Sequence, residues 1–185
     1  MKILYLSWDS DFFGFIVGKI EINTSQDSLA LIDQKPFFLA KEYKLLYLFC
    51  TENIVLPDSI GMKLMDNKVV FTEDFSDFIC DYPSNVKLYN EKIIMPDLLN
   101  LALISGEYSR FKLDSNFASG TFERLYERWI LNSINGTFAD AILCYYIDSH
   151  IYGMVTIQIK NSIGQIGLIA VHSAFQNQGI GSALM

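Results

Sequence analysis

Three apolar runs separated by very short connections occupy residues 141–172 and restrict the fold more than any other feature of the sequence. They read AILCYYID, IYGMVTIQIK and QIGLIAVH, with only SH and NSIG between them. Connections this short can join only neighbouring antiparallel strands, because a parallel crossover needs about a dozen residues or more. The sequence therefore predicts a three-stranded antiparallel meander over these residues.

A strongly amphipathic helix is expected immediately before the meander. Its apolar positions recur with the i, i+3, i+4, i+7, i+8 spacing of a buried face. They are Phe122, Leu125, Tyr126, Trp129, Ile130 and Ile134. Asn135 and Gly136 form a helix stop, and a further helix is expected over 98–108. These elements predict an α/β (α+β) fold, in which a mixed and largely antiparallel sheet is flanked by helices.

Two apolar parts of the chain are separated by the segment 81–97, in which Pro83 and Pro96 flank a polar stretch. We therefore expect two domains, a small α/β domain over 1–85 and a second domain over 86–185. Short strands are predicted in the first domain, at 16–22, 45–50 and 68–71.

The composition excludes several classes of partner. A formal net charge of −7 argues against nucleic acid or anionic lipid, since phosphate contacts need clustered Lys and Arg. No apolar run reaches the roughly 20 residues of a membrane span, and the N-terminus does not resemble a secretory signal. The three cysteines form no C-x-x-C pair, so we expect a cytoplasmic protein. Neither His150 nor His172 has partners at ligand spacing, so no metal is expected.

The turn after the last predicted strand, QNQGIGS, has the character of an anion-binding loop. It is not a P-loop, because no Lys follows the glycines, and it lacks the third glycine of a dinucleotide-binding fingerprint. Unpaired N–H groups at a helix start can nevertheless hold a pyrophosphate without any Lys. A structural alternative for Gln176 is a capping box with Ser173.

This turn, together with LIAVH before it, resembles the acetyl-coenzyme A loop of the GNAT superfamily of N-acetyltransferases. The order of two helices, a meander and then the loop is also similar. The resemblance implies that the pantetheine arm of acetyl-CoA pairs with the strand edge and that the loop amides hold the pyrophosphate. The implied cofactor-binding residues are Ile169, Ala170, Val171, Gln176, Asn177, Gln178, Gly179, Gly181 and Ser182.

Further motifs resemble those of the dTDP-fucosamine acetyltransferases, a GNAT family with a small N-terminal domain. They are LSWDSDFFGF, GMKLMDNKVVF, SRF and FERLYERWILNSINGTF. The resemblance implies acetyl transfer to the amine of a nucleotide-linked amino-dideoxy sugar, a small-molecule acceptor, with polysaccharide biosynthesis as the pathway.

The same resemblance assigns Asp66 as general base or water-holder. It also implies that Arg110 and Phe111 bind the acceptor, with Arg110 clamping its diphosphate. Alternatives are a plain hairpin turn at Asp66–Asn67 and a solvated loop charge at Arg110. The aromatic residues Trp8, Phe12 and Phe13 are interpreted as mainly structural, although they could stack a base.

A GNAT domain continues beyond the terminal helix, so the resemblance implies that its C-terminal strands are missing here. The tyrosine that protonates the leaving thiolate would lie in that part, and no residue of this chain is given its role. An exposed edge on the strand at 166–171 is then expected, which a second copy could cover as a homodimer. Alternatively, the first domain supplies the missing strands. The competing functions are a non-catalytic CoA-binding or interaction module, and transfer to another small amine or a protein.

Overall fold

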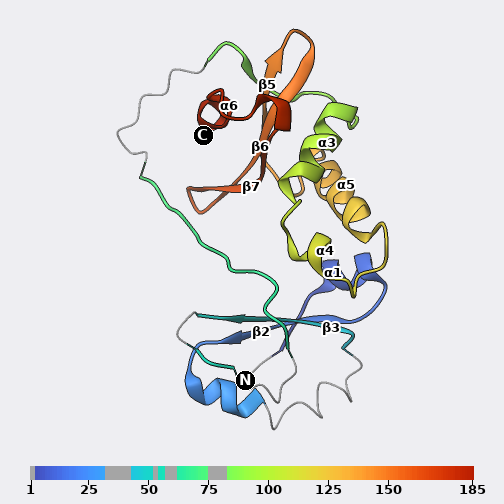
Figure 1. Ribbon diagram of the computed structural model, residues 1–185, viewed down its shortest axis with the longest axis vertical. Coiled ribbons are helices and arrows are strands. Elements are labelled where there is room, and N and C mark those ends of the chain that lie inside the picture. Colours follow the sequence, from blue (N-terminus) through green and yellow to red (C-terminus); the bar gives the residue numbers. More distant parts are fainter. Residues whose placement is uncertain (1–2, 32–42, 52–53, 57–61, 75–82) are drawn as a thin grey trace. The chain divides into compact units, whose positions relative to one another are not determined.

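A computed structural model describes the chain except for residues 1–2, 32–42, 52–53, 57–61 and 75–82 (Figure 1). The chain forms two compact units, unit 1 over Met1–Leu64 and unit 2 over Met65–Met185. The domain boundary predicted near residue 85 adjoins residues 75–82, which lie outside the described part. Within the described residues, no helix is long and apolar enough to cross a membrane.

Unit 1 is built on a small sheet with the strand order β1-β2-β3. β1 (Leu4–Tyr5) runs antiparallel to β2 (Val17–Ile22), and β3 (Leu45–Cys50) runs parallel to β2. The strands predicted at 16–22 and 45–50 are therefore confirmed to within a residue. Apolar side chains from the sheet and from the described helical stretch 25–31 form the core of this unit. They include Ile20, Ile22 and Leu31, with Leu46 and Leu48 packed against them.

A short helix, α1 (Ser7–Phe13), joins β1 to β2. It ends at Gly14, whose φ of 73° is the left-handed conformation that glycine adopts most readily. The buried hydroxyl of Ser10 donates to the carbonyl of Leu6 and accepts from the N–H of Val17. This residue therefore fixes the end of α1 against the start of β2.

The strand predicted at 68–71 is wrong, because residues 62–74 have no regular secondary structure. Val69, Val70 and Phe71 have the composition of a strand, but their side chains are exposed and no described strand pairs with them. Apolar composition alone does not make a strand without a neighbour to complete its hydrogen bonds. The alternative of a hairpin turn at Asp66–Asn67 is also wrong, since neither side of it is a described strand.

The sheet of unit 2 has the order β4-β5-β6-β7, and every neighbouring pair is antiparallel. The predicted meander is confirmed as β5 (Ala141–Ile147), β6 (His150–Lys160) and β7 (Ile163–Val171). Tight turns with positive φ at Asp148, Asn161 and Ser162 connect them. β4 (Val86–Leu88) adds a short strand beside β5 that the sequence did not predict.

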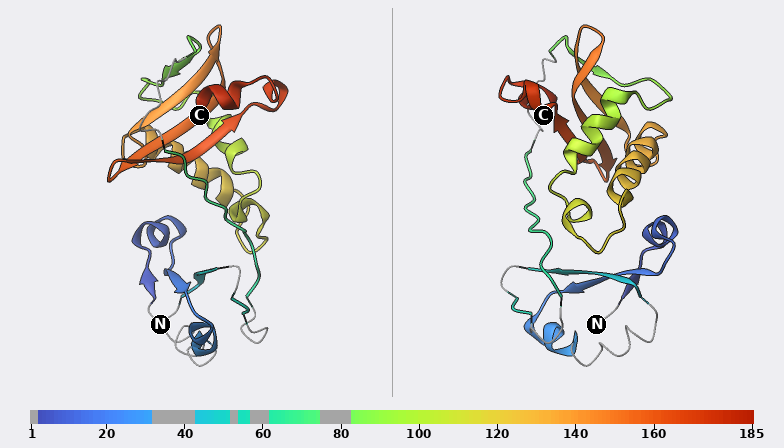
Figure 2. Two further views of the ribbon diagram at one scale, coloured as in Figure 1. Left: turned by 90° about the vertical axis from the view of Figure 1, so that its left-hand side faces the viewer. Right: turned by 45° about the vertical axis from the view of Figure 1, so that its right-hand side comes forward.

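Helices cover both faces of this sheet (Figures 1 and 2). α3 (Pro96–Ser105) and α5 (Thr121–Ile134) pack on one face, which confirms the two predicted helices. α6 (Ile180–Leu184) packs on the other face. The mixed fold, with an antiparallel sheet flanked by helices, is therefore the one expected from the sequence.

α6 approaches the sheet closely because β6 carries a glycine beneath it. A Cβ added to Gly153 would lie 2.7 Å from Cγ2 of Ile180 and 2.9 Å from Cδ1 of Leu184. Both α6 residues are almost fully buried, and they pack with Val155 in one apolar cluster. The absence of a side chain at residue 153 thus sets the position of the turn that precedes α6.

Candidate functional site

β7 is the last strand of the unit 2 sheet, and among the described residues only β6 pairs with it. The pairing is irregular in its middle, since Val155 faces Ile169 whereas Ile157 faces Ile166. The buried hydroxyl of Thr156 accepts a hydrogen bond of 2.8 Å from the N–H of Leu168 at this bulge. A Cβ on Gly167 would lie 2.8 Å from the same hydroxyl oxygen. A threonine opposite a glycine therefore stabilises the bulge.

Beyond the bulge, successive residues of β7 point their backbone N–H and C=O groups alternately towards β6 and towards the open edge. The N–H of His172 donates to the carbonyl of Tyr152, so residue 172 faces β6. In two antiparallel strands, a residue that lies between two hydrogen-bonded residues points its backbone N–H and C=O groups away from the partner strand. Of the three strand residues predicted to contact the cofactor, Ile169 and Val171 therefore direct backbone groups to the open edge, whereas those of Ala170 face β6. At this edge the carbonyl of Val171 accepts from the amide of Gln176.

The turn after β7 is ordered by side chains rather than by a capping box. A short helix, η2 (Ser173–Phe175), begins with His172, whose Nδ1 accepts from the N–H of Ala174. The amide of Gln176 donates to the carbonyl of Val171 at 3.2 Å. The alternative of a Ser173–Gln176 capping box is therefore wrong, because His172 is the capping residue and Gln176 reaches back to the strand.

The loop that follows is exposed and leads into the start of α6. Asn177 and Gly179 have φ values of 60° and 81°, and the residues from Gln176 to Gly179 are exposed. The first helical hydrogen bond of α6 is donated by the N–H of Ala183 to the carbonyl of Gly179. The N–H groups at the start of α6 precede the first intrahelical bond, so they have no intrahelical acceptor. Such a run of donors at a helix start suits a pyrophosphate, so the loop fits the pantetheine pyrophosphate of CoA.

A second polar group forms where the extended segment 62–74 meets α4 (Arg110–Leu113). Nη1 of Arg110 lies 3.5 Å from Oδ2 of Asp66. The guanidinium also lies over the ring of Phe111, 4.4 Å from its centroid. The structure therefore brings together three residues that the sequence analysis assigned to the acceptor.

Phe111 contributes to this group from the core rather than from the surface. Its side chain is buried and packs edge-on against Trp129, with a centroid distance of 5.6 Å. Phe117 lies at the same distance. Phe111 thus supports the guanidinium of Arg110 from beneath, and its ring is not presented to solvent.

Tyr126, from α5, is a neighbour of this group that sequence reasoning assigned only to the core. Burial raises the pKa of its phenol, while the hydroxyl of Ser109 and the charge of Arg110 oppose that shift. The ring lies against the backbone of Gly106, where an added Cβ would overlap it. The 3.6-residue period of α5 indicated a buried Tyr126 but gave no sign that its phenol would lie near charged groups.

The two groups occupy different parts of unit 2. The views agree that α4 and α6 lie towards opposite ends of this unit (Figures 1 and 2). Among the described residues, no hydrogen bond or ion pair of Asp66 or Arg110 reaches the loop at Gln176. The candidate site is therefore a loop and an open strand edge at one end, and a charged pair at the other.

Both histidines of the chain gather around Tyr152, at the end of the sheet that bears the loop. The ring centroids of His150 and His172 lie 6.3 and 6.0 Å from that of Tyr152, and Phe175 lies at 3.9 Å. Oδ2 of Asp97 lies 3.1 Å from Nδ1 of His150 and accepts from the N–H of Ile151. This cluster ties the start of α3 to the β5–β6 turn. The described residues contain no group of three or more side chains suited to a metal.

The part of the chain that contains the loop is similar to a known protein family. Residues 105–185 match the acetyltransferase (GNAT) family. The match covers less than half of the 185 residues, and this part of the chain is similar to a GNAT acetyltransferase domain. No curated protein matches the sequence.

Solved structures similar to part of this chain come from three organisms. An N-acetyltransferase, PaiA, of Thermoplasma acidophilum in complex with coenzyme A is 14% identical, with a TM-score of 0.40. A Pyrococcus horikoshii protein is 20% identical (TM-score 0.37), and a putative GNAT acetyltransferase of Desulfovibrio desulfuricans is 14% identical (TM-score 0.34). Each alignment covers 54% of this chain, and 66%, 66% and 60% of the respective structures. At these sequence identities and TM-scores, the structural similarities add no evidence beyond the family match.

The matched GNAT residues include α4, α5, the meander and the whole loop. Arg110 and Phe111 fall inside the match, whereas Asp66 falls outside it. The loop and the open edge of β7 are therefore the part of the candidate site that the family match covers completely.

Proposed function

We propose that the chain is an acetyl-CoA-dependent N-acetyltransferase whose acceptor is the amine of a nucleotide-linked amino-dideoxy sugar. The observation that carries the proposal is the exposed loop at residues 176–179, which leads into the N–H groups at the start of α6, at the end of an open strand within the GNAT match. A pyrophosphate on this loop leaves the pantetheine arm free to run along Ile169 and Val171 towards the bulge.

The reaction is a direct transfer without a covalent enzyme intermediate. The amine nitrogen attacks the thioester carbonyl, a C–N bond forms, and the C–S bond breaks to release CoA as its thiolate. The amine arrives mainly protonated and must lose a proton before the attack, so a nearby base or ordered water is needed. Amides that hold the cofactor in one geometry lower the entropy cost of this encounter.

The Asp66–Arg110 pair is proposed to serve the acceptor. Asp66 is the candidate base or water-holder, and Arg110 is the candidate donor to the diphosphate. Support comes from their separation of 3.5 Å and from the partial exposure of both side chains, which leaves them open to a ligand. A diphosphate brings two or more negative charges to Arg110, so it competes directly with the Asp66 carboxylate for the guanidinium.

Calorimetric titration with acetyl-CoA tests the cofactor part of the proposal. The Gly179→Asp variant places a carboxylate in the loop, and it should abolish binding. Gly136→Asp is the matched control, because Gly136 has a similar φ of 74° and, like Gly179, open space around it. Equal loss of binding in both variants would indicate general damage. Full binding by a folded Gly179→Asp variant would refute the loop as the cofactor site.

A non-catalytic interaction module is a second candidate, and the exposed side chains of β7 favour it. Ile163, Ile166 and Ile169 are 62%, 46% and 37% exposed along the open edge. Such an edge can pair with a strand of a partner or of a second copy. Transfer of a radiolabelled acetyl group to an amino-sugar nucleotide would show that the chain is an enzyme and not a non-catalytic module. Transfer to other amines that Arg110→Ala leaves unchanged would indicate a different acceptor.

A further inference from the structure

The open edge of β7 is partly occupied by a side chain of the loop that follows it. Val171 lies between two residues whose backbone groups face β6, so its carbonyl points to the open edge. The amide of Gln176 donates to this carbonyl at 3.2 Å. Because a carbonyl oxygen only accepts hydrogen bonds, the NH2 group of the Gln176 side chain, and not its oxygen, faces the strand.

The main chain between the strand and Gln176 is held in place. Nδ1 of His172 accepts from the N–H of Ala174 at 3.3 Å, and the N–H of Phe175 donates to the carbonyl of His172 at 2.8 Å. The ring of Phe175 packs on that of Tyr152, with a centroid distance of 3.9 Å, which attaches η2 to β6. Gln176 follows directly, so its side chain can leave the strand without any movement of η2.

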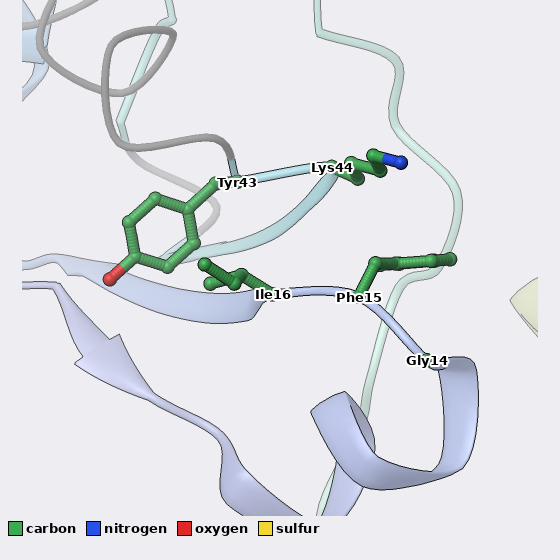
Figure 3. Close-up of a pocket in the computed structure, with 5 residues that line it drawn as sticks. All are labelled: Gly14, Phe15, Ile16, Tyr43 and Lys44. Carbon is green, nitrogen blue, oxygen red and sulfur yellow. The ribbon is translucent and has the colours of Figure 1, made fainter.

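A hydrogen bond made by a side chain is easier to release than one between two main-chain groups. In unit 1, for example, the N–H of Lys44 donates to the carbonyl of Ile16 at 3.2 Å, just before β3 and β2 begin (Figure 3). Breaking that bond requires the two main-chain segments to separate. The Gln176 side chain is exposed, so rotation about its own single bonds frees the Val171 carbonyl.

We propose that Gln176 is a latch on the open edge of β7, and that the pantetheine arm of the cofactor must displace it. This inference rests on the proposed function, in which the arm runs along Ile169 and Val171. The arm contains amide N–H groups, and a strand-edge carbonyl is their natural acceptor. A carbonyl oxygen has two lone pairs, but the Gln176 amide lies on the open side of the strand, where the arm itself would run. Gln176 therefore competes with the cofactor for the Val171 carbonyl.

Titrations of the full chain with S-acetylpantetheine, which lacks the pyrophosphate, test the latch by NMR. Gln176→Ala removes the competing donor, so it should strengthen this binding roughly three- to fivefold, about the value of one neutral hydrogen bond. Gln176→Glu should have a similar effect, because an ionised carboxylate cannot donate to a carbonyl. Gln165→Ala is the matched control and should have no effect. Gln165 is also an exposed glutamine near the same edge, but it lies in β7 on the other side of the bulge.

The sign of the change separates a latch from a purely structural role. A side chain that only orders the loop would weaken S-acetylpantetheine binding when it is removed. Weaker or unchanged binding in a folded Gln176→Ala variant would therefore overturn the latch. The carbonyl ¹³C shift of Val171 in the ligand-free chain is a second readout, and it should move in Gln176→Ala but not in Gln165→Ala. Circular dichroism establishes that each variant is folded.

Parallel calorimetry with acetyl-CoA separates the failure of this inference from the failure of the proposed function. If the wild type binds acetyl-CoA but Gln176→Ala gains no affinity for S-acetylpantetheine, the latch is overturned and the proposed function stands. If neither the wild type nor Gln176→Ala binds either ligand, the proposed cofactor site is refuted and the latch with it. Gln176→Glu should also weaken acetyl-CoA binding while it strengthens S-acetylpantetheine binding, since its charge repels only the ligand that carries a pyrophosphate. Opposite changes for the two ligands would support both.

Discussion

The carboxylate of Asp66 and the guanidinium of Arg110 meet at 3.5 Å, although the two residues are far apart in the chain. Their side chains are 48% and 29% exposed, respectively. Solvent screens a pair of this kind, which contributes about 1 kcal/mol or less to folding. Its significance is therefore positional, because it holds the candidate base and the candidate diphosphate-binding residue in one place.

Asp66→Asn should lower acetyl transfer about a hundredfold or more, because it removes the proposed general base, and yet change the free energy of unfolding little. Arg110→Ala should instead raise KM for the nucleotide-linked acceptor. Steady-state kinetics with urea unfolding of the same samples measures both effects. Lys112→Ala is the control, since the Lys112–Glu123 pair is also exposed but lies outside the candidate site. Equal loss of activity and stability in the Asp66 variant would contradict the catalytic assignment.

Gly153→Ala should displace α6 and weaken acetyl-CoA binding without touching the loop. The new Cβ would meet Ile180 and Leu184 below 3.0 Å, and overpacking of this kind typically costs about 1–3 kcal/mol. Gly164→Ala in β7 is the control, because a Cβ there meets nothing within 4 Å. Thermal unfolding and calorimetry with acetyl-CoA should separate the two variants. Unchanged affinity in Gly153→Ala would show that the position of α6 does not matter to the loop.

Thr156→Val should destabilise the bulge of β7. The substitution keeps the shape of the side chain but leaves the buried N–H of Leu168 without its acceptor, at a cost of about 1–3 kcal/mol. Thr156→Ser keeps the hydroxyl and should recover most of that loss. Hydrogen exchange of the Leu168 amide measures the effect locally. Equal exchange rates in Thr156→Val and the wild type would mean that another group satisfies this amide.

The meander and the long helices could be predicted because short-range patterns encode them. Turns of a few residues determine which strands pair, and the 3.6-residue period of α5 identifies its buried face. β4 was missed because three residues carry no period, and its place depends on β5, which lies far away in the sequence. The strand expected at 68–71 failed for the opposite reason, since its composition was right but no neighbour pairs with it.

The candidate site, too, could be predicted from the sequence only where its residues are contiguous. The loop at residues 176–182 is contiguous, so its glycines and its place after a strand are visible in the sequence. The contact of Asp66 with Arg110 depends on the path of residues 62–74, which no local pattern indicates. Tyr126 beside Ser109 also follows from the tertiary packing of α5 on Gly106.

Cys144 should resist alkylation in the folded chain. Its side chain is fully buried in β5, and burial raises the pKa of its thiol from 9.0 to about 12. The thiolate is the reactive form, so at pH 8 the buried thiol has neither the charge nor the access that iodoacetamide needs. Cys50 is exposed and should react readily. In a Cys50→Ser/Cys80→Ser variant, labelling of Cys144 should become fast only after unfolding in urea.

The raised pKa of Cys144 also has a consequence for stability. Because the folded state binds the thiol proton more tightly than the unfolded state does, stability is complete below pH 9. It should fall as the pH rises from about 9 to about 12. The pKa of Tyr146 is also raised to about 12 by burial, so its phenol contributes to the same loss above pH 10. A Cys144→Ala variant isolates the thiol contribution, since it should flatten the pH dependence of unfolding between pH 9 and 10. An unchanged slope there, or fast alkylation of the folded chain, would show that the thiol is accessible to water.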